Sequence, residues 1–260
     1  MSASARRALR IMETVGAAER PLGATEIGRA LGLSPATAFR GLDALERAGY
    51  ASRFQSSAKF VLGKNVAALR QSLFARFPIR DVCAPYLRQL AFASGETVSL
   101  TVRLGWYGLR IAAAPGTNEV TSSPPLGAVR PLGEGCAGRA ILAFLPRDAA
   151  DGYAASVRRR GGRAPGGPAL AEIRKAGFAA EATPFARERA ALAFPLCTAE
   201  GAIAAVAIEG PVVELARPAA HESLPHWRGI VQSLQRLAQA RPALFAGPFD
   251  HLDPDDIVLP

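Results

Sequence analysis

Apolar residues in the first third of the chain recur at helical spacing in three short segments. An α-helix advances about 100° per residue, so apolar positions three or four residues apart share one face. The positions that predict the three helices are Leu9, Met12 and Val15 in residues 5–17, Ile27, Ala30 and Leu31 in residues 25–31, and Ala38, Leu42 and Leu45 in residues 33–50.

The third segment has a marked beginning and a marked end. Ser34 can cap the first turn through its hydroxyl, Pro35 suits the first helical position, and Gly49 can adopt the left-handed conformation that stops a helix. The face opposite the apolar one is small, polar and partly basic, and it holds Ala36, Thr37, Arg40, Asp43, Ala44 and Arg47. Such a face fits a helix that enters the major groove of DNA, although an ordinary surface helix would have a similar pattern.

The neighbouring segments favour the DNA-binding interpretation. Gly32 and Leu33 form a tight connection between the second and third helices, as in a helix-turn-helix. Residues 50–62 alternate around a polar Gln-Ser-Ser turn, which predicts a two-stranded hairpin. Three helices followed by a small hairpin describe a winged helix-turn-helix.

The rest of the chain predicts a connecting helix and a second domain of α+β class. Residues 64–74 carry Val66, Leu69 and Leu73 at helical spacing, and Pro78 should end this linker helix and mark the domain boundary. In the second domain we expect helices at residues 81–94, 137–145, 169–176 and 224–240. We expect strands at residues 96–103 and 109–114 and two further strands within 190–209. A flexible Arg-, Gly- and Pro-rich loop is expected at 158–168 and a loosely packed tail from 247.

Length and composition limit the class of protein. A chain of 260 residues favours two domains, and a hydrophobic content of 49% excludes wholesale disorder. No signal peptide is evident, and the most apolar region, residues 190–213, is interrupted by proline and polar residues rather than forming a membrane span. Three scattered cysteines offer neither a disulfide framework nor zinc spacing, which predicts a cytoplasmic protein.

Positive charge is concentrated at the amino-terminal end. Residues 1–80 hold thirteen Lys or Arg and five Asp or Glu, a net of +8, while residues 81–260 hold eighteen and seventeen, a net of +1. DNA binding draws much of its affinity from counterion release at phosphates, so a basic module beside a nearly neutral one is the expected pattern.

One glycine motif could indicate a nucleotide site. Residues 133–138 (GEGCAG) have the spacing of a dinucleotide fingerprint and precede a predicted helix. However, Pro131 precedes them and no clear βαβ unit surrounds them, so we favour the mouth of a small-ligand pocket, where backbone N–H groups at a helix start attract anions.

Catalysis and metal binding have little support in the sequence. All three histidines, His221, His226 and His251, lie near the end of the chain and show no recognisable spacing to a nucleophile. Cys136 at a helix start could be reactive, but a buried structural thiol is the commoner case. The acidic residues Asp253, Asp255 and Asp256 lack the remaining features of a calcium loop. We therefore predict no cofactor, no metal and no enzymatic activity.

The order of several motifs resembles one family, the IclR-type bacterial transcriptional regulators. The motifs are residues 8–12, 25–27, 32–42, 49–50 and 60–63 in the first domain, and residues 85–87, 95–100, 131–132, 138–143, 170–177, 193–195 and 210–211 in the second. The resemblance implies a winged helix-turn-helix at 1–63, a linker helix at 64–77, a GAF-like mixed α+β effector-binding and oligomerisation domain at 78–245, and a tail at 246–260.

The resemblance also implies an effector cavity in the second domain. The family pattern places seven residues around it, namely Cys136, Ala137, Glu181, Arg189, Ala191, Ala207 and Glu209. The chain departs from the pattern at Gly133, where a histidine is usual, at Arg139, where a lysine is usual, and at Glu209, where a small hydroxyl residue is common. Arg189 could pair with an effector carboxylate. Glu181 and Glu209 would resist one unless they are paired with arginine or face a polar or amine-bearing ligand instead.

The resulting hypothesis is a ligand-responsive regulator of metabolic genes. It would act as a homodimer or tetramer on a palindromic DNA operator, with an organic acid as one candidate effector. The expected DNA contacts are Ser34, Ala36, Thr37 and Arg40 on the third helix and Arg53 and Lys59 in the wing. Two alternatives remain open: a hydrolase or nucleotide-binding enzyme whose winged helix binds protein, and a constitutive DNA-binding protein whose second domain only oligomerises.

Overall fold

The computed structural model describes residues 2–117, 124–183, 189–211, 218–245, 247–248, 252–255 and 257, except for the side chains of residues 182, 183, 189 and 218–221. Within it the chain divides into two compact units, Met1–Ala75 and Arg76–Pro260, each with its own hydrophobic core. The predicted linker helix is α4 (Lys64–Phe74), which belongs to the first unit. The division after Ala75 falls slightly before the predicted boundary at Pro78.

Three helices form the body of the first unit: α1 (Ala3–Ala17), α2 (Ala24–Leu31) and α3 (Pro35–Arg47). Their core contains Ile11, Val15, Ile27, Ala38, Leu42, Leu45 and Phe60. The predicted inner face of α1 is shifted, because Ile11 is fully buried whereas Leu9 remains 44% exposed. The burial of Val15 four residues after Ile11 keeps the helical spacing that the sequence predicted.

A glycine turn joins α2 to α3. Gly32 has φ 66°, in the left-handed region, and the amide of Leu33 donates a 2.8 Å hydrogen bond to the carbonyl of Gly28. Only glycine adopts this conformation without a Cβ penalty, so the chain can reverse within two residues and begin α3 at Pro35. The helix-turn-helix is thereby confirmed.

The wing follows α3 and is part of a small sheet. Strands β2 (Ala51–Arg53) and β3 (Lys59–Leu62) form the predicted hairpin, and a short strand that the sequence analysis did not anticipate, β1 (Leu22–Gly23), pairs with the other side of β3. The turn between β2 and β3 has Gln55 and Ser56 at positive φ, 47° and 57°.

A six-stranded antiparallel sheet forms the centre of the second unit. Its order is β6-β5-β4-β9-β8-β7. The strands are β4 (Thr97–Leu104), β5 (Tyr107–Ala114), β6 (Val129–Pro131), β7 (Ala179–Thr183), β8 (Arg189–Thr198) and β9 (Gly201–Pro211).

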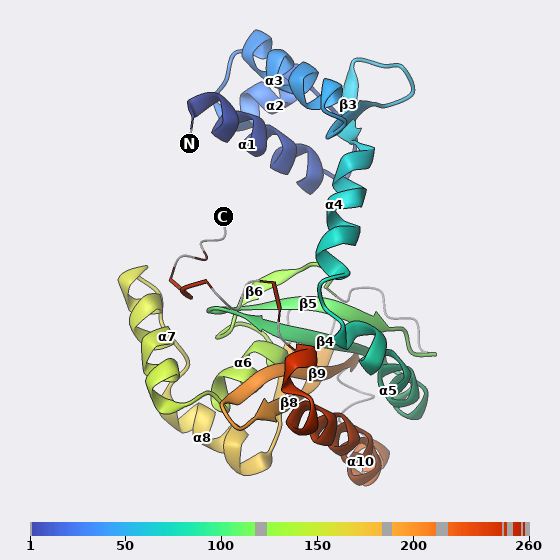
Figure 1. Cartoon of the computed structure of the whole chain (residues 1–260), viewed down its shortest axis with the longest axis vertical. Helices are drawn as coiled ribbons and strands as arrows, with labels where there is room; N and C mark the ends of the chain where they lie inside the picture. Colours follow the sequence, from blue (N-terminus) through green and yellow to red (C-terminus); the bar gives the residue numbers. More distant parts are fainter. Residues whose placement is uncertain are drawn as a thin grey trace. The chain divides into compact units, whose positions relative to one another are not determined.

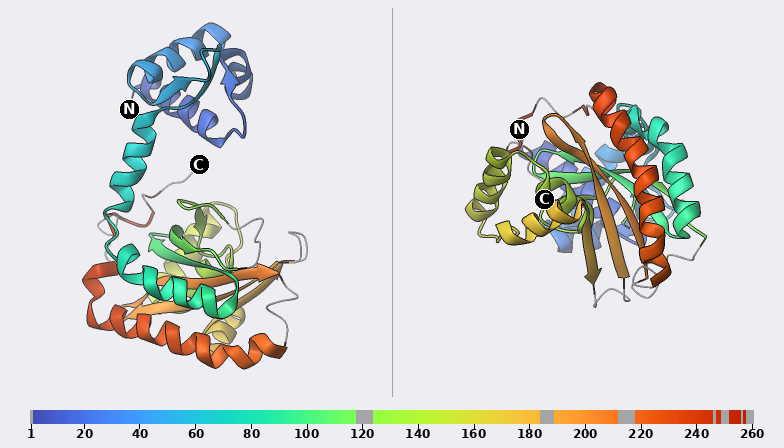
Figure 2. Two further views of the ribbon diagram at one scale, coloured as in Figure 1. Left: turned by 90° about the vertical axis from the view of Figure 1, so that its right-hand side faces the viewer. Right: turned by 90° about the horizontal axis from the view of Figure 1, so that it is seen from below.

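Helices cover both faces of this sheet. On one face α5 (Ile79–Ser94) and α10 (Pro218–Ala240) lie side by side (Figures 1 and 2). On the other face α6 (Cys136–Ala143) packs against β8 and β9, with α8 (Gly167–Ala176) beside it. Alternation along β9 directs Ala205 and Ala207 toward the α6 side, where they join its core cluster. The α+β class and the mixed architecture of this domain are confirmed.

The structure corrects several predicted elements of the second unit. Helix α7 (Arg147–Arg159) was not predicted, and it includes the first residues of the segment expected to be a flexible loop. The strands β4 and β5 extend further into their turn than predicted, and α10 begins at Pro218 with Pro225 inside it. A 3-10 turn, Pro242–Phe245, follows α10. The tail is attached in part, since Asp255 accepts hydrogen bonds from Trp106 at 2.9 Å and from Arg159 at 2.6 Å.

Candidate functional site

The start of α3 is organised by three polar side chains. The Ser34 hydroxyl caps the helix by accepting from the amide of Thr37 at 3.2 Å, and it donates to the Thr37 hydroxyl at 2.8 Å. Arg40, one turn on, donates to the same Thr37 hydroxyl at 3.2 Å. These side chains therefore form one continuous polar row at the amino-terminal end of the helix.

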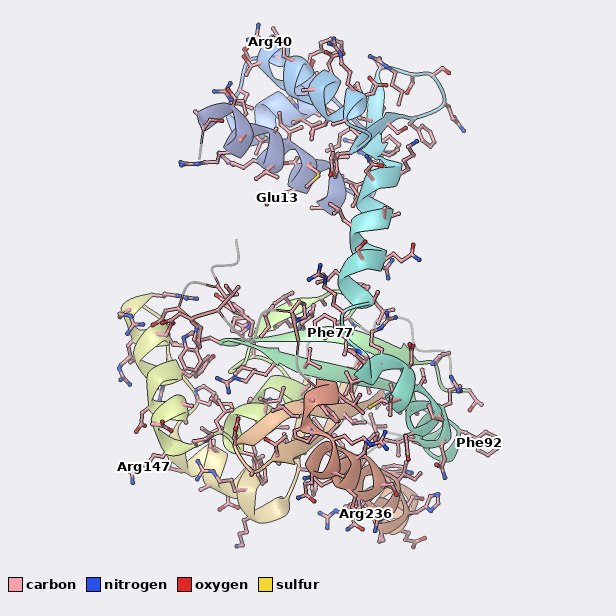
Figure 3. The ribbon with its side chains drawn as sticks, in the orientation of Figure 1. Glu13, Arg40, Phe77, Phe92, Arg147 and Arg236 are labelled. Atoms are coloured by element: carbon pink, nitrogen blue, oxygen red, sulfur yellow. The ribbon has the colours of Figure 1, made fainter. Side chains whose placement is uncertain are left out.

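This polar row lies on the solvent side of α3. Ser34, Ala36 and Arg40 are exposed and Thr37 is half-buried, while Ala38, Leu42 and Leu45 are buried against the other helices. The side chain of Arg40 projects from α3 away from the body of the first unit (Figure 3). The two faces of α3 thus match the predicted division, and the outer face can approach a large polar surface.

The two predicted wing contacts differ in their surroundings. Lys59 is exposed on β3. Arg53 on β2 is held instead by α3, because its Nε lies 3.2 Å from a carboxylate oxygen of Glu46. Its guanidinium also lies over two aromatic rings, 6.0 Å from the centroid of Phe39 and 5.0 Å from that of Phe60. A phosphate contact by Arg53 remains a prediction, and it would have to compete with Glu46.

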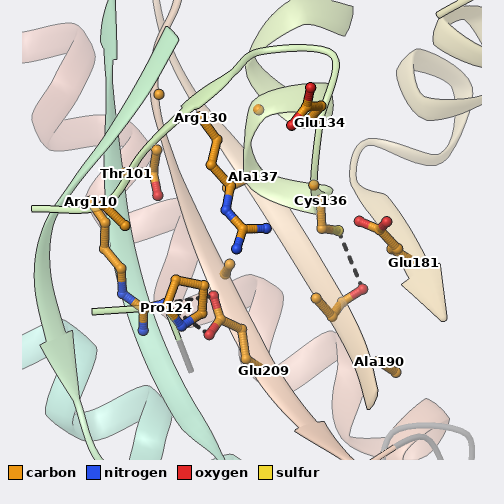
Figure 4. A pocket seen from close by; sticks show the side chains of 16 residues that line it. Thr101, Arg110, Pro124, Arg130, Glu134, Cys136, Ala137, Glu181, Ala190 and Glu209 are labelled. Carbon is orange, nitrogen blue, oxygen red and sulfur yellow. Dashed lines mark hydrogen bonds and ion pairs between the residues drawn. The ribbon is translucent and has the colours of Figure 1, made fainter. Parts of the chain in front are cut away.

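The second unit contains a cavity of about 420 Å³ on the α6 side of the sheet (Figure 4). All six strands of the sheet and the start of α6 contribute to its walls. Six of the seven residues expected at an effector site line it, namely Cys136, Ala137, Glu181, Ala191, Ala207 and Glu209. The seventh, Arg189, has its backbone at the start of β8, but its side chain lies outside the described part of the structure.

Glu209 in this cavity is neutralised by an arginine. The Arg110 guanidinium on β5 lies 2.9 Å from one oxygen of Glu209 and 3.1 Å from the other, and Ser99 donates a further 3.1 Å hydrogen bond. Arg110 is only 4% exposed, so this is a buried ion pair that spans the central strand β4. Arg110 was not predicted from the sequence, where its only signal was its position on an alternating strand.

Glu181 is paired in the same way from the other side. Arg139 on α6 lies 2.8 Å from a carboxylate oxygen of Glu181 on β7. Arginines therefore neutralise both carboxylates, and this was the condition for an acid to enter the cavity. The residue at position 139 departs from the usual lysine of the family pattern, and a guanidinium can serve here because it binds carboxylates with a planar fork of donors.

A second missed residue, Arg130, brings positive charge to the cavity. It lies on the edge strand β6, and its side chain extends into the cavity between Ala137 and Pro124 (Figure 4). No ion pair joins Arg130 to any residue that the structure describes. The exposed Glu134 also lines the cavity, but its carboxylate is directed away from the Arg130 guanidinium (Figure 4). The sequence signals near Arg130 were the motif Pro131–Leu132 and the glycine motif at residues 133–138.

Cys136 is placed as a structural thiol. Its Sγ lies 3.2 Å from the carbonyl oxygen of Ala179 and 3.3 Å from that of Ala191, to which the thiol can donate. Burial, together with the nearby Glu181 carboxylate, raises the pKa of this thiol to about 12. Because only a thiolate is a strong nucleophile, Cys136 is unsuited to covalent catalysis at neutral pH.

The surroundings of the glycine motif differ from a dinucleotide site. The preceding strand β6 is short, lies at the sheet edge and runs antiparallel to β5. All strand pairs in the described part of this sheet are antiparallel, so no parallel crossover presents the motif to a pyrophosphate. Gly135 instead ends the loop at φ 74° and lets α6 begin directly at the cavity.

The described residues form neither a metal site nor a membrane span. No group of three or more histidine, cysteine or acidic side chains there is placed to hold a metal ion. None of the described helices has the length and apolar character required to cross a bilayer.

Comparison with protein-family models identifies both units. The IclR helix-turn-helix domain model matches residues 4–53, and the model described as "Bacterial transcriptional regulator IclR C-terminal" matches residues 71–236. The HTH-type transcriptional regulator KipR of Bacillus subtilis is 30% identical over 129 residues, which are 50% of this chain and 51% of KipR. The HTH-type transcriptional repressor AllR of Klebsiella pneumoniae is 28% identical over 124 residues, 48% and 46% of the two chains.

The matched region thus spans about half the length of these relatives. Solved structures cover more of the chain. The Thermotoga maritima IclR superposes with a TM-score of 0.67 at 21% identity, covering 88% of this chain and 94% of that one. An IclR homolog from Microbacterium hydrocarbonoxydans, complexed with 4-hydroxybenzoate, gives 0.68 at 21% identity, covering 90% and 100%. These structures establish the fold, and together with the two family models they lead to one conclusion: the chain belongs to the IclR family of bacterial transcriptional regulators.

Proposed function

We propose that this protein is a ligand-responsive transcriptional regulator that binds operator DNA through its first unit and a small organic acid through its second. The observation that carries the proposal is the presence in one chain of an exposed polar row on a helix-turn-helix and a cavity with neutralised carboxylates. The packing of a hydrophobic core requires neither feature, so a binding role explains both.

The charge of the first unit supports DNA as its ligand. By the printed sequence, residues 1–75 hold eleven Lys or Arg and five Asp or Glu, a net of +6, and the remaining residues hold twenty and seventeen, a net of +3; together these recover +9. A basic unit of this size with a helix whose outer face is small and polar matches the major-groove binding mode. In this proposal Ser34, Ala36, Thr37 and Arg40 contact the groove, and Lys59 contacts the backbone beside it.

The charge of the cavity supports an acid as the effector. With Glu209 paired to Arg110 and Glu181 paired to Arg139, Arg130 provides the positive charge that a carboxylate can bind. The remaining walls include Ala137, Ala191 and Ala207, which leave room for a compact apolar body. The complex of a structurally similar homolog with 4-hydroxybenzoate makes this compound a reasonable first probe.

The assembly and location complete the proposal. A homodimer or tetramer would place two α3 helices in major grooves about one helical turn or a multiple apart, so the operator would be an imperfect palindrome. Because its target is chromosomal DNA, we place the protein in the bacterial cytoplasm. The proposal requires no cofactor and no catalytic step.

DNA binding is tested by anisotropy titration of duplexes at several salt concentrations. Affinity should fall linearly on a log–log plot as salt rises, because phosphate binding releases counterions. If Arg40 reads a base, Arg40→Ala should weaken DNA binding by about 1 to 3 kcal/mol. If Arg40 holds a phosphate, the substitution should lower the slope of the salt dependence by about one. The matched control is Arg147→Ala, an exposed arginine of α7, which should change neither quantity. A wild-type protein that ignores duplex DNA at low salt would contradict the proposal.

Effector binding is tested by calorimetric titration with benzoate, 4-hydroxybenzoate, short aliphatic acids and the matching neutral amides. Acids should bind and amides should not, because the Arg130 guanidinium recognises charge. Removal of one charge-assisted hydrogen bond costs about 1.5 to 3 kcal/mol, so Arg130→Ala should weaken acid binding about tenfold to hundredfold. Equal binding of acids and amides, or unaltered binding by the variant, would exclude Arg130 as the carboxylate partner.

A further inference from the structure

An aromatic side chain on the recognition helix is exposed without an evident structural reason. Phe39, directly before Arg40 on α3, is 45% exposed, although most other outward positions of this helix are small or polar. Exposed apolar area of this size is unfavourable, at about 25 cal/mol for each Å² left in water. A ligand that covers the ring would recover that free energy.

The position of Phe39 places it at the edge of the outer face. It follows Ala36 by three residues and precedes Asp43 by four, so the three side chains are neighbours on the helix surface. Ala36 is small and exposed, which allows a partner to come close to the helix backbone beside the ring. Phe39 is therefore on the part of α3 that is available to a DNA groove, on the side that faces the wing.

Arg53 flanks this ring from the wing side, and Glu46 holds Arg53. The Arg53 guanidinium is 6.0 Å from the Phe39 centroid and 5.0 Å from that of Phe60, a core residue that is 1% exposed. Glu46, about two helical turns after Phe39, binds the same guanidinium at 3.2 Å. Arg53 is thus anchored to the core, to the end of α3 and to the ring, and its ion pair makes it a poor candidate for a phosphate contact.

We propose that Phe39 contacts the 5-methyl group of a thymine in the operator, and that Arg53 is the positioning residue that holds the Phe39 ring for this contact. The inference rests on the proposed DNA-binding function. The thymine methyl is the apolar feature of the major groove, and apolar side chains recognise it there. The ring's exposure, its place beside Ala36 and its anchored flank together favour this contact over a nonspecific one with the sugar–phosphate backbone.

The direct test removes single methyl groups from the DNA. A duplex selected from a randomised pool by the wild-type protein is rebuilt with deoxyuridine in place of each thymine in turn. Each half-site should contain one thymine whose single replacement by deoxyuridine weakens wild-type binding about fourfold, because burial of one methyl group contributes about 0.8 kcal/mol. Phe39→Ala should bind the unsubstituted duplex less tightly and should show no further loss at that position.

Two variants separate recognition from loss of structure. Phe54→Ala removes another exposed phenylalanine, 40% exposed in the wing, and should keep the fourfold deoxyuridine effect. Phe39→Leu retains an apolar side chain, so it should keep part of the deoxyuridine effect that Phe39→Ala loses. Phe39→Ala should also bind random duplex DNA as the wild type does, which verifies that the unit remains folded.

Arg53 has a distinct signature in the same assay. As a positioning residue, Arg53→Ala should reduce the deoxyuridine effect while leaving the salt slope unchanged, and Arg53→Lys should restore part of the effect. A phosphate contact would instead lower the slope by about one and spare the deoxyuridine effect, and that result would overturn the assignment of Arg53.

The possible failures can be told apart. If the wild-type protein binds DNA selectively but its deoxyuridine profile equals that of Phe39→Ala, the Phe39 inference is wrong and the proposed function stands. If the wild-type protein selects no sequence and ignores duplex DNA, both are wrong.

Discussion

Among single residues, the carboxylates of the cavity show most clearly how a partner changes the chemistry of a side chain. Glu209 would oppose an acidic ligand if it were alone, but Arg110 compensates its charge and Ser99 satisfies part of its hydrogen bonding. Arg130, by contrast, keeps its charge directed into the cavity. The difference comes from neighbours on other strands rather than from the residues themselves.

This pairing predicts a large effect of Glu209→Ala on stability. The substitution leaves the Arg110 guanidinium buried beside an empty position, and breaking a buried pair costs about 3 to 5 kcal/mol. Urea unfolding of the second unit would measure it. Glu134→Ala, an exposed carboxylate of the same cavity, is the control and should change stability by less than about 0.5 kcal/mol. Similar small effects of both variants would show that the Arg110–Glu209 pair contributes little.

Cys136 predicts a dependence of stability on alkaline pH. Its native pKa is about 12 against an ordinary value of 9.0, so the unfolded thiol ionises first. The contribution of this thiol is therefore fully present below pH 9 and is lost as pH rises from about 9 toward about 12. Between pH 8.5 and 10 the wild type should lose about 1 kcal/mol more than Cys136→Ala, measured by urea unfolding. Equal losses in the two proteins would mean that the native thiol ionises normally.

Secondary-structure elements depend on local signals of unequal strength. The boundaries of α3 followed from Ser34, Pro35 and Gly49, because a cap, a fixed φ and a left-handed glycine act within a few residues. Helix α7 was missed because Gly152 lies in its middle and its inner stripe is made largely of small residues. Ala149, Ala150, Tyr153 and Val157 recur at helical spacing and pack against the core, but two of the four are alanines, which give a weak signal in the sequence.

The glycine between α2 and α3 provides a prediction at this scale. A Cβ added at Gly32 would meet no atom within 4 Å, so Gly32→Ala should act only through its positive φ. The expected cost is about 1 to 2 kcal/mol in the unfolding of the first unit.

Gly229 is the matched control for this substitution. It is exposed in the interior of α10, and a Cβ there would also meet nothing within 4 Å, but its φ is not in the left-handed region. Gly229→Ala should therefore stabilise the second unit by about 0.5 to 1 kcal/mol. Changes of the same sign in both variants would contradict this explanation of the turn.

The whole molecule consists of two units with separate cores. In differential scanning calorimetry we expect duplex DNA to raise the unfolding temperature of the first unit and the best-binding acid of the panel to raise that of the second. An acid at about 100 times its Kd should add about 2.7 kcal/mol to the stability of the unit that binds it. A shift of the first unit alone by the acid would place its site outside the cavity.

The sequence by itself determined the DNA-binding unit, because the helical period, the helix caps and the hairpin turn are local signals that residues close in the chain supply to one another. It also indicated most of the cavity residues, but only through the family resemblance. The tertiary structure alone decided the charge of the cavity. Arg110 and Glu209 meet because β4 pairs with both of their strands, and because a register shift in the β4–β5 pairing between Leu100 and Thr101 brings Arg110 opposite Thr101. Without that one-residue shift Arg110 would be directed to the opposite face of the sheet. Long-range pairing of this kind leaves no local trace in the chain, which is why Arg110 and Arg130 emerged only from the fold.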